Sequence, residues 1–247
     1  AEEAAAFLIP HLEPGMEILD LGCGPGSITV GVARYVAPSC VVGVDNAPAA
    51  LDAARQHAAA EHMDNVTFTA ANVYELPFDD ASFDVVYAHQ LMQHLTDPVA
   101  ALVEAGRVLR PGGYVAVRDA DYGTMTHHPH EPAIDRRFAA YSAAARANGG
   151  EPDAGRRLLS WVRAAGYEHL HAATSSWTFA TEDERRWWAE LWVGRVDRGG
   201  ALDRDELASI AAGFRNWAAQ PDGWFAFIHG EVIGQKPLPS RRPDPPG

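Results

Sequence analysis

The feature that most constrains this chain is a short apolar segment that runs directly into a glycine-rich turn and then into a helical pattern. Residues 19–26 read LDLGCGPG, and the helical pattern begins at Ser27. Glycines adopt positive φ at little cost and let a ligand approach the backbone closely. The first turn of the following helix presents free N–H groups toward that ligand. The segment therefore predicts a ligand-binding unit of strand, loop and helix.

The first half of the chain repeats this alternation of apolar strand and amphipathic helix. The predicted strands are Glu17–Leu21, Val41–Asp45, Val66–Ala70, Phe83–Ala88 and Tyr114–Ala120. The first two predicted helices are Ser27–Val36 and Pro48–Glu61. A third begins at Asp97 and Pro98 and ends before Pro111-Gly112-Gly113. Its predicted inner face consists of Val99, Leu102, Val103 and Gly106. This spacing predicts an α/β fold, a parallel sheet with helices on both faces.

The second half has a different character, because all seven tryptophans lie after residue 160. We predict a helix whose apolar face consists of Ile134, Phe138, Tyr141 and Ala145, and a short helix over Leu158–Ala165. Two more helices begin at capping boxes, one at Thr181 and Glu184 and the other at Asp203 and Glu206. The predicted strands are His169–Ala180 and Trp224–Gln235. We expect a core over residues 1–125, completion of the sheet with a helical cap inserted before the last strand over 126–236, and a proline-rich tail over 237–247.

Acidic and amide side chains stand where a ligand of this sheet would lie. Asp20 comes two positions before the first glycine, and Ser27 stands where a dinucleotide-binding fingerprint has its third glycine. A carboxylate at Asp20 suits a cationic amino group and repels a pyrophosphate. Asp45, at the end of the second strand, can accept hydrogen bonds from ribose hydroxyls.

In order along the chain, LDLGCGPG, VGVDNA, AANVYELPF, FDVVYAHQLMQHL and VLRPGGYVAVRD resemble the motifs of class I S-adenosylmethionine-dependent methyltransferases. The nearest subgroup is the ubiquinone/menaquinone-biosynthesis type. The resemblance covers about residues 15–120. It implies a Rossmann-like seven-stranded, mostly parallel sheet of order 3-2-1-4-5-7-6 with strand 7 antiparallel, and S-adenosylmethionine as cofactor.

The same resemblance implies which residues hold the cofactor. Asp20, Gly22, Gly24 and Gly26 would line the methionine side, Asp45 would hold the ribose, and Asn72 and Val73 would flank the adenine. Many relatives have Asp where Asn72 stands, and an amide can still donate and accept. The full set of expected cofactor residues is Asp20, Gly22, Cys23, Gly24, Gly26, Asp45, Asn46, Asn72, Val73, His89 and Gln90.

Methyl transfer from a sulfonium needs alignment and exclusion of water, and it needs a general base only if the nucleophile carries a proton. His89 is the candidate base, with a hydrogen-bonded wall of the cofactor pocket as the alternative. Asp121 and Tyr122 follow the fifth strand and are candidates for substrate contact, or for fixing a loop. Trp188 and Trp192 are candidates for an aromatic substrate wall, or for the core of the cap.

The composition limits the partners. The formal net charge is −13, which disfavours nucleic acid and anionic membranes. No apolar run has membrane-spanning length, and two cysteines, Cys23 and Cys40, favour reduced thiols in the cytoplasm. His127, His128 and His130 match no recognised ligand spacing, so we expect an exposed loop and no metal. Homodimerisation is left open.

These observations predict methyl transfer from S-adenosylmethionine to a small aromatic or heteroaromatic metabolite, at oxygen, nitrogen or carbon, of the kind found in secondary metabolism. Two alternatives remain at this point. One is a nicotinamide-dependent oxidoreductase on a similar sheet, which Asp20 and Ser27 disfavour. The other is a non-catalytic protein that binds S-adenosylmethionine.

Overall fold

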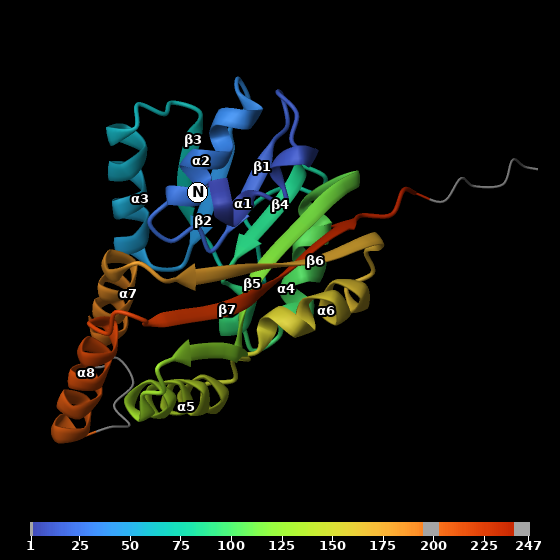
Figure 1. Cartoon of the computed structure of the whole chain (residues 1–247). Coiled ribbons are helices and arrows are strands. Elements are labelled where there is room, and N and C mark those ends of the chain that lie inside the picture. The colour runs from blue at the N-terminus through green and yellow to red at the C-terminus, as the bar shows by residue number, and fades with distance from the viewer. Residues whose placement is uncertain (1, 195–202, 240–247) are drawn as a thin grey trace, which may run out of the picture.

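A seven-stranded sheet forms the centre of the computed structural model, which describes residues 2–194 and 203–239 (Figure 1). The strand order is β3-β2-β1-β4-β5-β7-β6, and β7 runs antiparallel to both of its neighbours. The predicted order and the antiparallel strand are therefore confirmed. The strands are β1 (Ile18–Leu21), β2 (Val41–Asp45), β3 (Val66–Ala70), β4 (Phe83–His89), β5 (Leu109–His128), β6 (Glu168–Phe179) and β7 (Trp224–Gln235).

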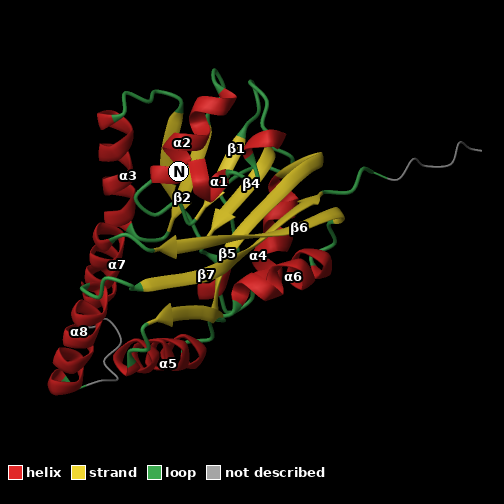
Figure 2. Cartoon of the chain, in the orientation of Figure 1, coloured by secondary structure: helices red, strands yellow, loops and turns green. Residues whose placement is uncertain are grey.

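Helices lie on both faces of the sheet (Figure 2). The α-helices are α1 (Glu2–Ala5), α2 (Ser27–Val36), α3 (Pro48–Ala60), α4 (Pro98–Val108), α5 (Pro132–Ala147), α6 (Leu158–Ala164), α7 (Glu182–Gly194) and α8 (Arg204–Ala218). Short 3-10 turns are η1 (Ile9–His11), η2 (Met92–His94) and η3 (Ala154–Arg157). One face packs its apolar side chains against α1 and α2, and the other packs them against α4 and α6.

The observed bounds of β1, β2, β3 and β4 lie within one residue of the bounds predicted from apolar runs. The bounds of β5 differ. The predicted fifth strand covered Tyr114–Ala120, whereas β5 extends from Leu109 to His128. Its pairing with β7 shifts register between Asp121 and Thr126 and then resumes. A bulge of this kind lets a strand continue past a polar stretch. The expected division at residues 125 and 126 consequently falls inside β5.

Helix ends follow their capping residues. The Asp97 side chain accepts the N–H of Ala100, and Asp203 with Glu206 forms a complete capping box. The Thr181–Glu184 box is present as well, with 2.9 Å from Thr181 N to Glu184 Oε2 and 3.3 Å from Glu184 N to Thr181 Oγ1. The predicted inner face of α4 was wrong at Val103, which is 54% exposed, because the buried stripe consists of Ala101, Leu102, Ala105 and Val108.

The helical cap consists of α5, α7 and α8, which gather at one end of the molecule (Figure 1). The predicted cap was an insertion before the last strand, where α7 and α8 lie. The observed cap is larger, because it also includes α5, which lies between β5 and β6 in the sequence. An aromatic cluster fills it, with Trp188 and Phe225 at a centroid separation of 3.8 Å and Trp217 and Phe214 fully covered. The cap is thus an independent apolar core attached to the β6 and β7 side of the sheet.

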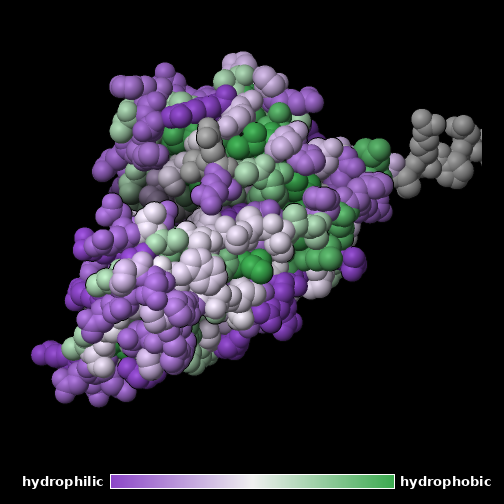
Figure 3. Space-filling model, viewed as in Figure 1, coloured by the Kyte–Doolittle hydropathy of each residue, from purple (hydrophilic) through white to green (hydrophobic). Residues whose placement is uncertain are grey.

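One face of the molecule carries many hydrophilic side chains. Figure 3 shows hydrophilic side chains over α3, α7 and α8. Within residues 2–194 and 203–239, no helix has both the length and the apolar character needed to span a membrane. Cys23 and Cys40 are both free thiols.

The two adjacent tryptophans of α7 test the cap core. Trp188 is 2% exposed, whereas Trp187 is 60% exposed. We expect Trp188→Ala to lower the free energy of unfolding by about 3–5 kcal/mol, because it removes a buried ring and leaves a cavity. Trp187→Ala is the matched control and should change it by about 0.5 kcal/mol or less. Denaturant unfolding of both variants measures this, and equal losses would contradict the assignment of Trp188 to the core.

Candidate active site

Three glycines with positive φ form the loop between β1 and α2. Their φ values are +67° at Gly22, +51° at Gly24 and +74° at Gly26, a region that side chains disfavour. A Cβ atom on Gly26 would meet Ala54 at 2.8 Å, so this glycine allows two helices to pack. A Cβ atom on Gly24 would meet nothing within 4 Å. Gly24 therefore borders open space, as expected of a residue that contacts a ligand.

That open space is a cavity of about 370 Å³ at the carboxyl ends of β1 and β4. The cavity is lined by Ala4, Asp20, Gly22, Cys23, Gly24, Pro25, Ser27, Ile28, His89 and Trp177. The glycine loop and the first turn of α2 form one side, and His89 and Trp177 form another. The parallel strands β1 and β4 end side by side here, which places the predicted loop and the predicted histidine in one site.

Asp20 is the carboxylate that lines this cavity. It is 4% exposed, and its Oδ2 accepts a hydrogen bond of 2.6 Å from Thr29 Oγ1. Burial raises the pKa of Asp20 to about 7, and the nearby charge of Asp45 acts in the same direction, against the Thr29 hydrogen bond. The site therefore has a carboxylate whose ionisation a cationic ligand would favour.

Asp45 lies at the end of β2 and is tied to the glycine loop. Its Oδ2 accepts the Gly24 N–H at 3.0 Å, and its Oδ1 accepts the Ala47 N–H at 2.9 Å. Each carboxylate oxygen keeps a further lone pair for a ligand hydroxyl. Asn46 is the next residue on this loop.

The other expected cofactor residues lie at the ends of β3 and β4. Asn72 Oδ1 accepts the Tyr74 N–H at 3.1 Å, and Val73 packs half-buried against the main core. Gln90 has φ +51°, its N–H donates to Arg118 O, and its side-chain nitrogen lies 3.2 Å from His229 Nε2. All three follow their strands at the same edge of the sheet, but none of them lines the cavity itself.

The geometry of His89 argues against the predicted role of general base. Its Nε2 lies 2.7 Å from the Arg118 Nη1. A guanidinium only donates, so the Nε2 lone pair is already used. Burial, together with the positive charge of Arg118, lowers the pKa of His89 to about 3. The alternative of a hydrogen-bonded wall agrees better with this arrangement.

The candidate substrate residues lie away from the cavity lining. Both carboxylate oxygens of Asp121 pair with Arg156 at 2.6 Å, which fixes β5 just before its register shift. Tyr122 stacks on Tyr141 at 4.7 Å and contacts Trp192 edge-on. Trp188 and Trp192 are 2% and 4% exposed within the aromatic core of the cap. None of these four residues lines this cavity, and the contacts agree with the alternatives of a fixed loop and a cap core, so a role in substrate contact stays a prediction.

The motif reasoning missed Trp177, which lines the cavity, and three buried polar residues that lie behind its ring or pair with one another there. Trp177 lies on β6, Arg118 on β5, and His229 and Glu231 on β7. The side chains of Arg118 and His229 are fully buried. Charged and polar residues inside otherwise apolar strands were the only signal in the sequence that could have indicated them.

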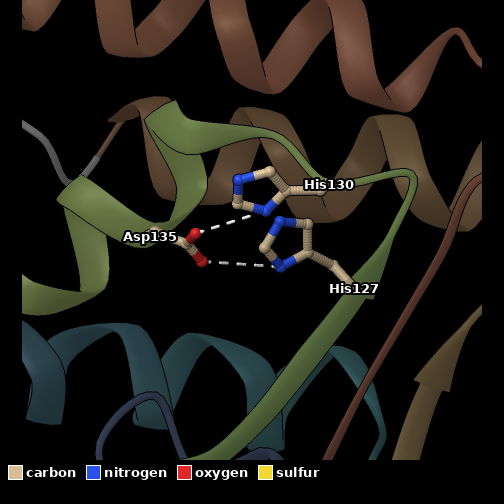
Figure 4. Close-up of side chains that lie close together, drawn as sticks. All are labelled: His127, His130 and Asp135. Atoms are coloured by element: carbon tan, nitrogen blue, oxygen red, sulfur yellow. Dashed lines mark ion pairs between the residues drawn. The ribbon is translucent and has the colours of Figure 1, made fainter.

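His127 near the end of β5, His130 in the following loop and Asp135 of α5 form a cluster that spacing alone did not predict (Figure 4). His127 and His130 each have an Nδ1 near Asp135, at 3.9 and 3.4 Å, and the ligand atoms of all three residues lie within 4.8 Å of one another. Only 8% of the His127 side chain is exposed, so the expectation of an exposed loop fails at that residue, whereas His128 and His130 are exposed as expected.

The hydrogen bond to His127 determines which of its ring nitrogens carries the hydrogen atom. The Glu131 N–H donates to His127 Nε2 at 3.0 Å, which places the hydrogen of the neutral ring on Nδ1, the atom that faces Asp135. A metal ligand must present a lone pair at that position. As arranged, the cluster fastens the start of α5 through an N–H to carboxylate contact.

Comparison with known proteins identifies the family. The family model for a methyltransferase domain matches residues 12–166. The chain belongs to this methyltransferase family. It is 35% identical to an uncharacterized methyltransferase of Schizosaccharomyces pombe over 95% of this chain and 90% of the relative. It is 30% identical to a probable methyltransferase of Aspergillus luteorubrus, over 96% of this chain and 91% of the relative.

Solved structures share the fold of this chain. The YcgJ protein of Bacillus subtilis superposes with a TM-score of 0.65 at 17% identity, over 97% of this chain and 100% of that one. The protein is thus an S-adenosylmethionine-dependent methyltransferase with the Rossmann-like fold of its family. The family assignment decides against the nicotinamide-dependent oxidoreductase.

The cavity of this methyltransferase fits its cofactor. The residues that line it include the carboxylate of Asp20 and no arginine or lysine. Such a lining suits a cationic ligand that carries no phosphate. Gly24 leaves room beside the Asp45 carboxylate, whose two oxygens suit a pair of hydroxyl groups. The predicted cofactor, S-adenosylmethionine, has both a cationic methionine part and a ribose.

Two glycines separate backbone strain from cofactor contact. Gly15 and Gly24 both have positive φ, and a Cβ atom on either would meet nothing within 4 Å, but only Gly24 lines the cavity. Both Gly→Ala variants should lose about 1 kcal/mol or more of stability. We expect Gly24→Ala alone to weaken S-adenosylmethionine binding, by about tenfold or more, because its methyl group enters the ligand space. Calorimetric titration measures this, and equal affinity in both variants would contradict the placement of the cofactor.

Proposed function

We propose that this methyltransferase acts on a small aromatic or heteroaromatic metabolite, as enzymes of secondary metabolism do. One observation carries the proposal: a single cavity joins the glycine loop to the rings of His89 and Trp177. Flat aromatic side chains at the far side of a cofactor pocket favour a flat acceptor, which they can stack on or meet edge-on. The acceptor atom is oxygen, nitrogen or carbon.

We assign the cofactor contacts as follows. Asp20 binds the methionine ammonium group from the buried end of β1, and Asp45 accepts from the ribose hydroxyls. Asn72 and Val73 flank the adenine, with Asn46 and Gln90 at the rim. S-adenosylmethionine supplies a methyl group on a sulfonium, already activated for displacement. The residues of the chain then need only to orient the acceptor and exclude water.

The charge of the chain supports a small acceptor. A net charge of −13 disfavours approach to a phosphate backbone, and the residues that line the cavity include no cation. Free thiols at Cys23 and Cys40 fit a place in the cytoplasm.

The raised pKa of Asp20 predicts that cofactor binding depends on pH. With a pKa of about 7, the carboxyl is largely neutral below that pH and ionised above it. Only the ionised form attracts an ammonium group, so affinity for S-adenosylmethionine should rise as the pH increases through about 7. Binding near pH 7 should also release a proton, because the cation stabilises the carboxylate.

Calorimetry in two buffers of different ionisation enthalpy measures that proton. Asp20→Asn should abolish the buffer dependence and weaken binding. Asp119, whose pKa burial also raises to about 7, accepts N–H groups of Met92 and Gln93 and lies outside the cavity lining. Proton release that persists in Asp20→Asn would assign the titration to another group such as Asp119.

A direct test of the function uses isotopically labelled S-adenosylmethionine. The protein is incubated with small phenols, aromatic acids, aromatic amines and heterocycles, and in parallel with nucleic acid and with protein extract. Mass spectrometry should find labelled methyl groups on an aromatic small molecule, lost in Gly24→Val. Label confined to the macromolecules would overturn the proposal, as would cofactor binding without any methylated product.

A further inference from the structure

Asp20 and Thr29 form a buried hydrogen-bonded pair where the chain passes from β1 to α2. Thr29 Oγ1 donates to Asp20 Oδ2 at 2.6 Å, and the exposed fractions are 1% for Thr29 and 4% for Asp20. Asp20 lines the cavity, whereas Thr29 does not. The hydroxyl group can therefore influence a ligand in the cavity only through the carboxylate that it contacts.

The glycine loop brings these two residues together. Asp20 lies in β1, and Thr29 is the third residue of α2, in the first turn of that helix. The loop reverses the chain between them, so that the first turn of α2 returns to the end of β1. A threonine in a helix can instead donate to a carbonyl of the preceding turn. Here the Asp20 carboxylate accepts the hydroxyl hydrogen, which links the strand to the helix beside the ligand space.

This hydrogen bond leaves one carboxylate oxygen for a ligand. Oδ2 accepts from Thr29, and no residue that the structure describes donates a hydrogen bond to Oδ1 of Asp20. Rotation of the carboxylate would break a short contact at a place that water barely reaches, so the hydroxyl holds its orientation. A group that is already oriented loses less entropy when a ligand binds. Oδ1 is consequently the oxygen that the cavity offers to a ligand.

The hydroxyl also opposes the two effects that disfavour ionisation of Asp20. Burial raises the pKa of Asp20 to about 7, the Thr29 hydrogen bond lowers it, and the charge of Asp45 on β2 raises it. The residues that line the cavity include no lysine or arginine. Thr29 therefore gives the ionised carboxylate a stabilisation that no cation of the lining supplies.

The other titratable groups that face Asp20 are neutral near pH 7. Burial raises the pKa of the Cys23 thiol in the loop and of the Tyr87 hydroxyl on β4. Burial, then the charge of Arg118, lowers the pKa of His89 on β4 to about 3. A change in the charge of Asp20 near neutral pH is thus not compensated by these three groups.

We propose that Thr29 is a positioning residue of the cofactor site, whose hydroxyl orients the Asp20 carboxylate so that Oδ1 receives the ammonium group of S-adenosylmethionine. This inference rests on the contact between Asp20 and the ammonium group in the proposed function. It adds a residue outside the cavity lining to those that determine affinity. Without the hydroxyl, the neutral form of Asp20 is favoured, and a neutral carboxyl no longer attracts a cation.

Two ligands separate the ammonium contact from the rest of the cofactor. S-adenosylhomocysteine and 5′-methylthioadenosine share adenine, ribose and a neutral thioether, and only the first carries an amino-acid group. The full chain and its variants are titrated with each ligand by calorimetry. Thr29→Val replaces the hydroxyl by a methyl group, and at pH 7 it should weaken S-adenosylhomocysteine about tenfold and methylthioadenosine less than about twofold. Thr29→Ser keeps the hydroxyl and should restore the affinity ratio of the parent protein.

The pH dependence of binding is a second measurement, which loss of packing alone would not change. In the parent protein, affinity for S-adenosylhomocysteine should rise as the pH increases through about 7, because Asp20 ionises there. In Thr29→Val the midpoint should move to higher pH by about one unit, because the hydrogen bond that favours the ionised form is absent. Thr29→Ser should keep the parent midpoint, and methylthioadenosine should show no such rise.

Val32→Ala is the matched control for a general loosening of α2. Val32 lies in the same helix, is 3% exposed and does not line the cavity. Its truncation should lower the free energy of unfolding and leave the ratio of the two affinities unchanged. Thr29→Ala takes the place of Thr29→Val if that variant does not fold, because alanine suits a helix and also lacks the hydroxyl.

The outcomes separate this inference from the proposed function. Equal weakening of both ligands in the variants without the hydroxyl, or an unchanged affinity ratio and midpoint, would overturn Thr29 as a positioning residue. Binding of S-adenosylhomocysteine that does not depend on pH in the parent protein would overturn the ammonium contact of Asp20. A parent protein that does not bind S-adenosylhomocysteine would instead overturn the proposed function.

Discussion

The buried ion pair between Arg118 and Glu231 holds together the part of the sheet on which the site depends. The two residues are direct partners across the antiparallel β5–β7 pairing, and Arg118 is 0% exposed. Removing two charges from water is costly, and the Coulomb attraction offsets that cost only when the remaining hydrogen-bonding groups are satisfied. Ser175 of β6 and His89 of β4 complete the guanidinium hydrogen bonds. Four strands are thus tied to one another through one charged group.

The orientation of the site follows from that pair. Because the Arg118 guanidinium occupies the His89 Nε2 lone pair, the His89 ring is fixed in one tautomer and cannot exchange a proton near neutrality. The same guanidinium lies over Trp177. The side of the cavity formed by His89 and Trp177 is consequently held in place by hydrogen bonds and neutral at its surface, whereas the side formed by the glycine loop carries the Asp20 carboxylate.

The cofactor half could be predicted from the sequence because its parts are local. A strand, a glycine loop and a helix are consecutive, and β2 and β3 end where Val41–Asp45 and Val66–Ala70 were expected. Parallel pairing then brings the strand ends to one edge without further information. The residues on and behind the opposite wall of the cavity could not be predicted in this way. Trp177, His229 and Arg118 meet only through the register of β5, β6 and β7, which no local pattern specifies.

The tryptophans of α7 show the same limit. The sequence placed Trp188 and Trp192 on a helix and left a substrate wall or the core of the cap open, because helical spacing does not tell what a face packs against. In the structure Trp188 packs against Phe214 of α8 and Phe225 of β7. The tryptophan that reaches the cavity stands in a strand, at a position that alternation marks only as facing one side of the sheet.

Alternation also suggests how such a fold can change its acceptor while keeping its cofactor. Ser175 and Trp177 lie two residues apart on β6, as do His229 and Glu231 on β7, so each pair projects from the same face. Substitutions at these positions alter the side chains on and behind one wall of the cavity without touching the loop at Gly22–Gly26. Changes must be coordinated, however, because removing Glu231 alone would leave the Arg118 charge buried without its counterion. The ion pair therefore also limits which single substitutions the strands beside the cavity can tolerate.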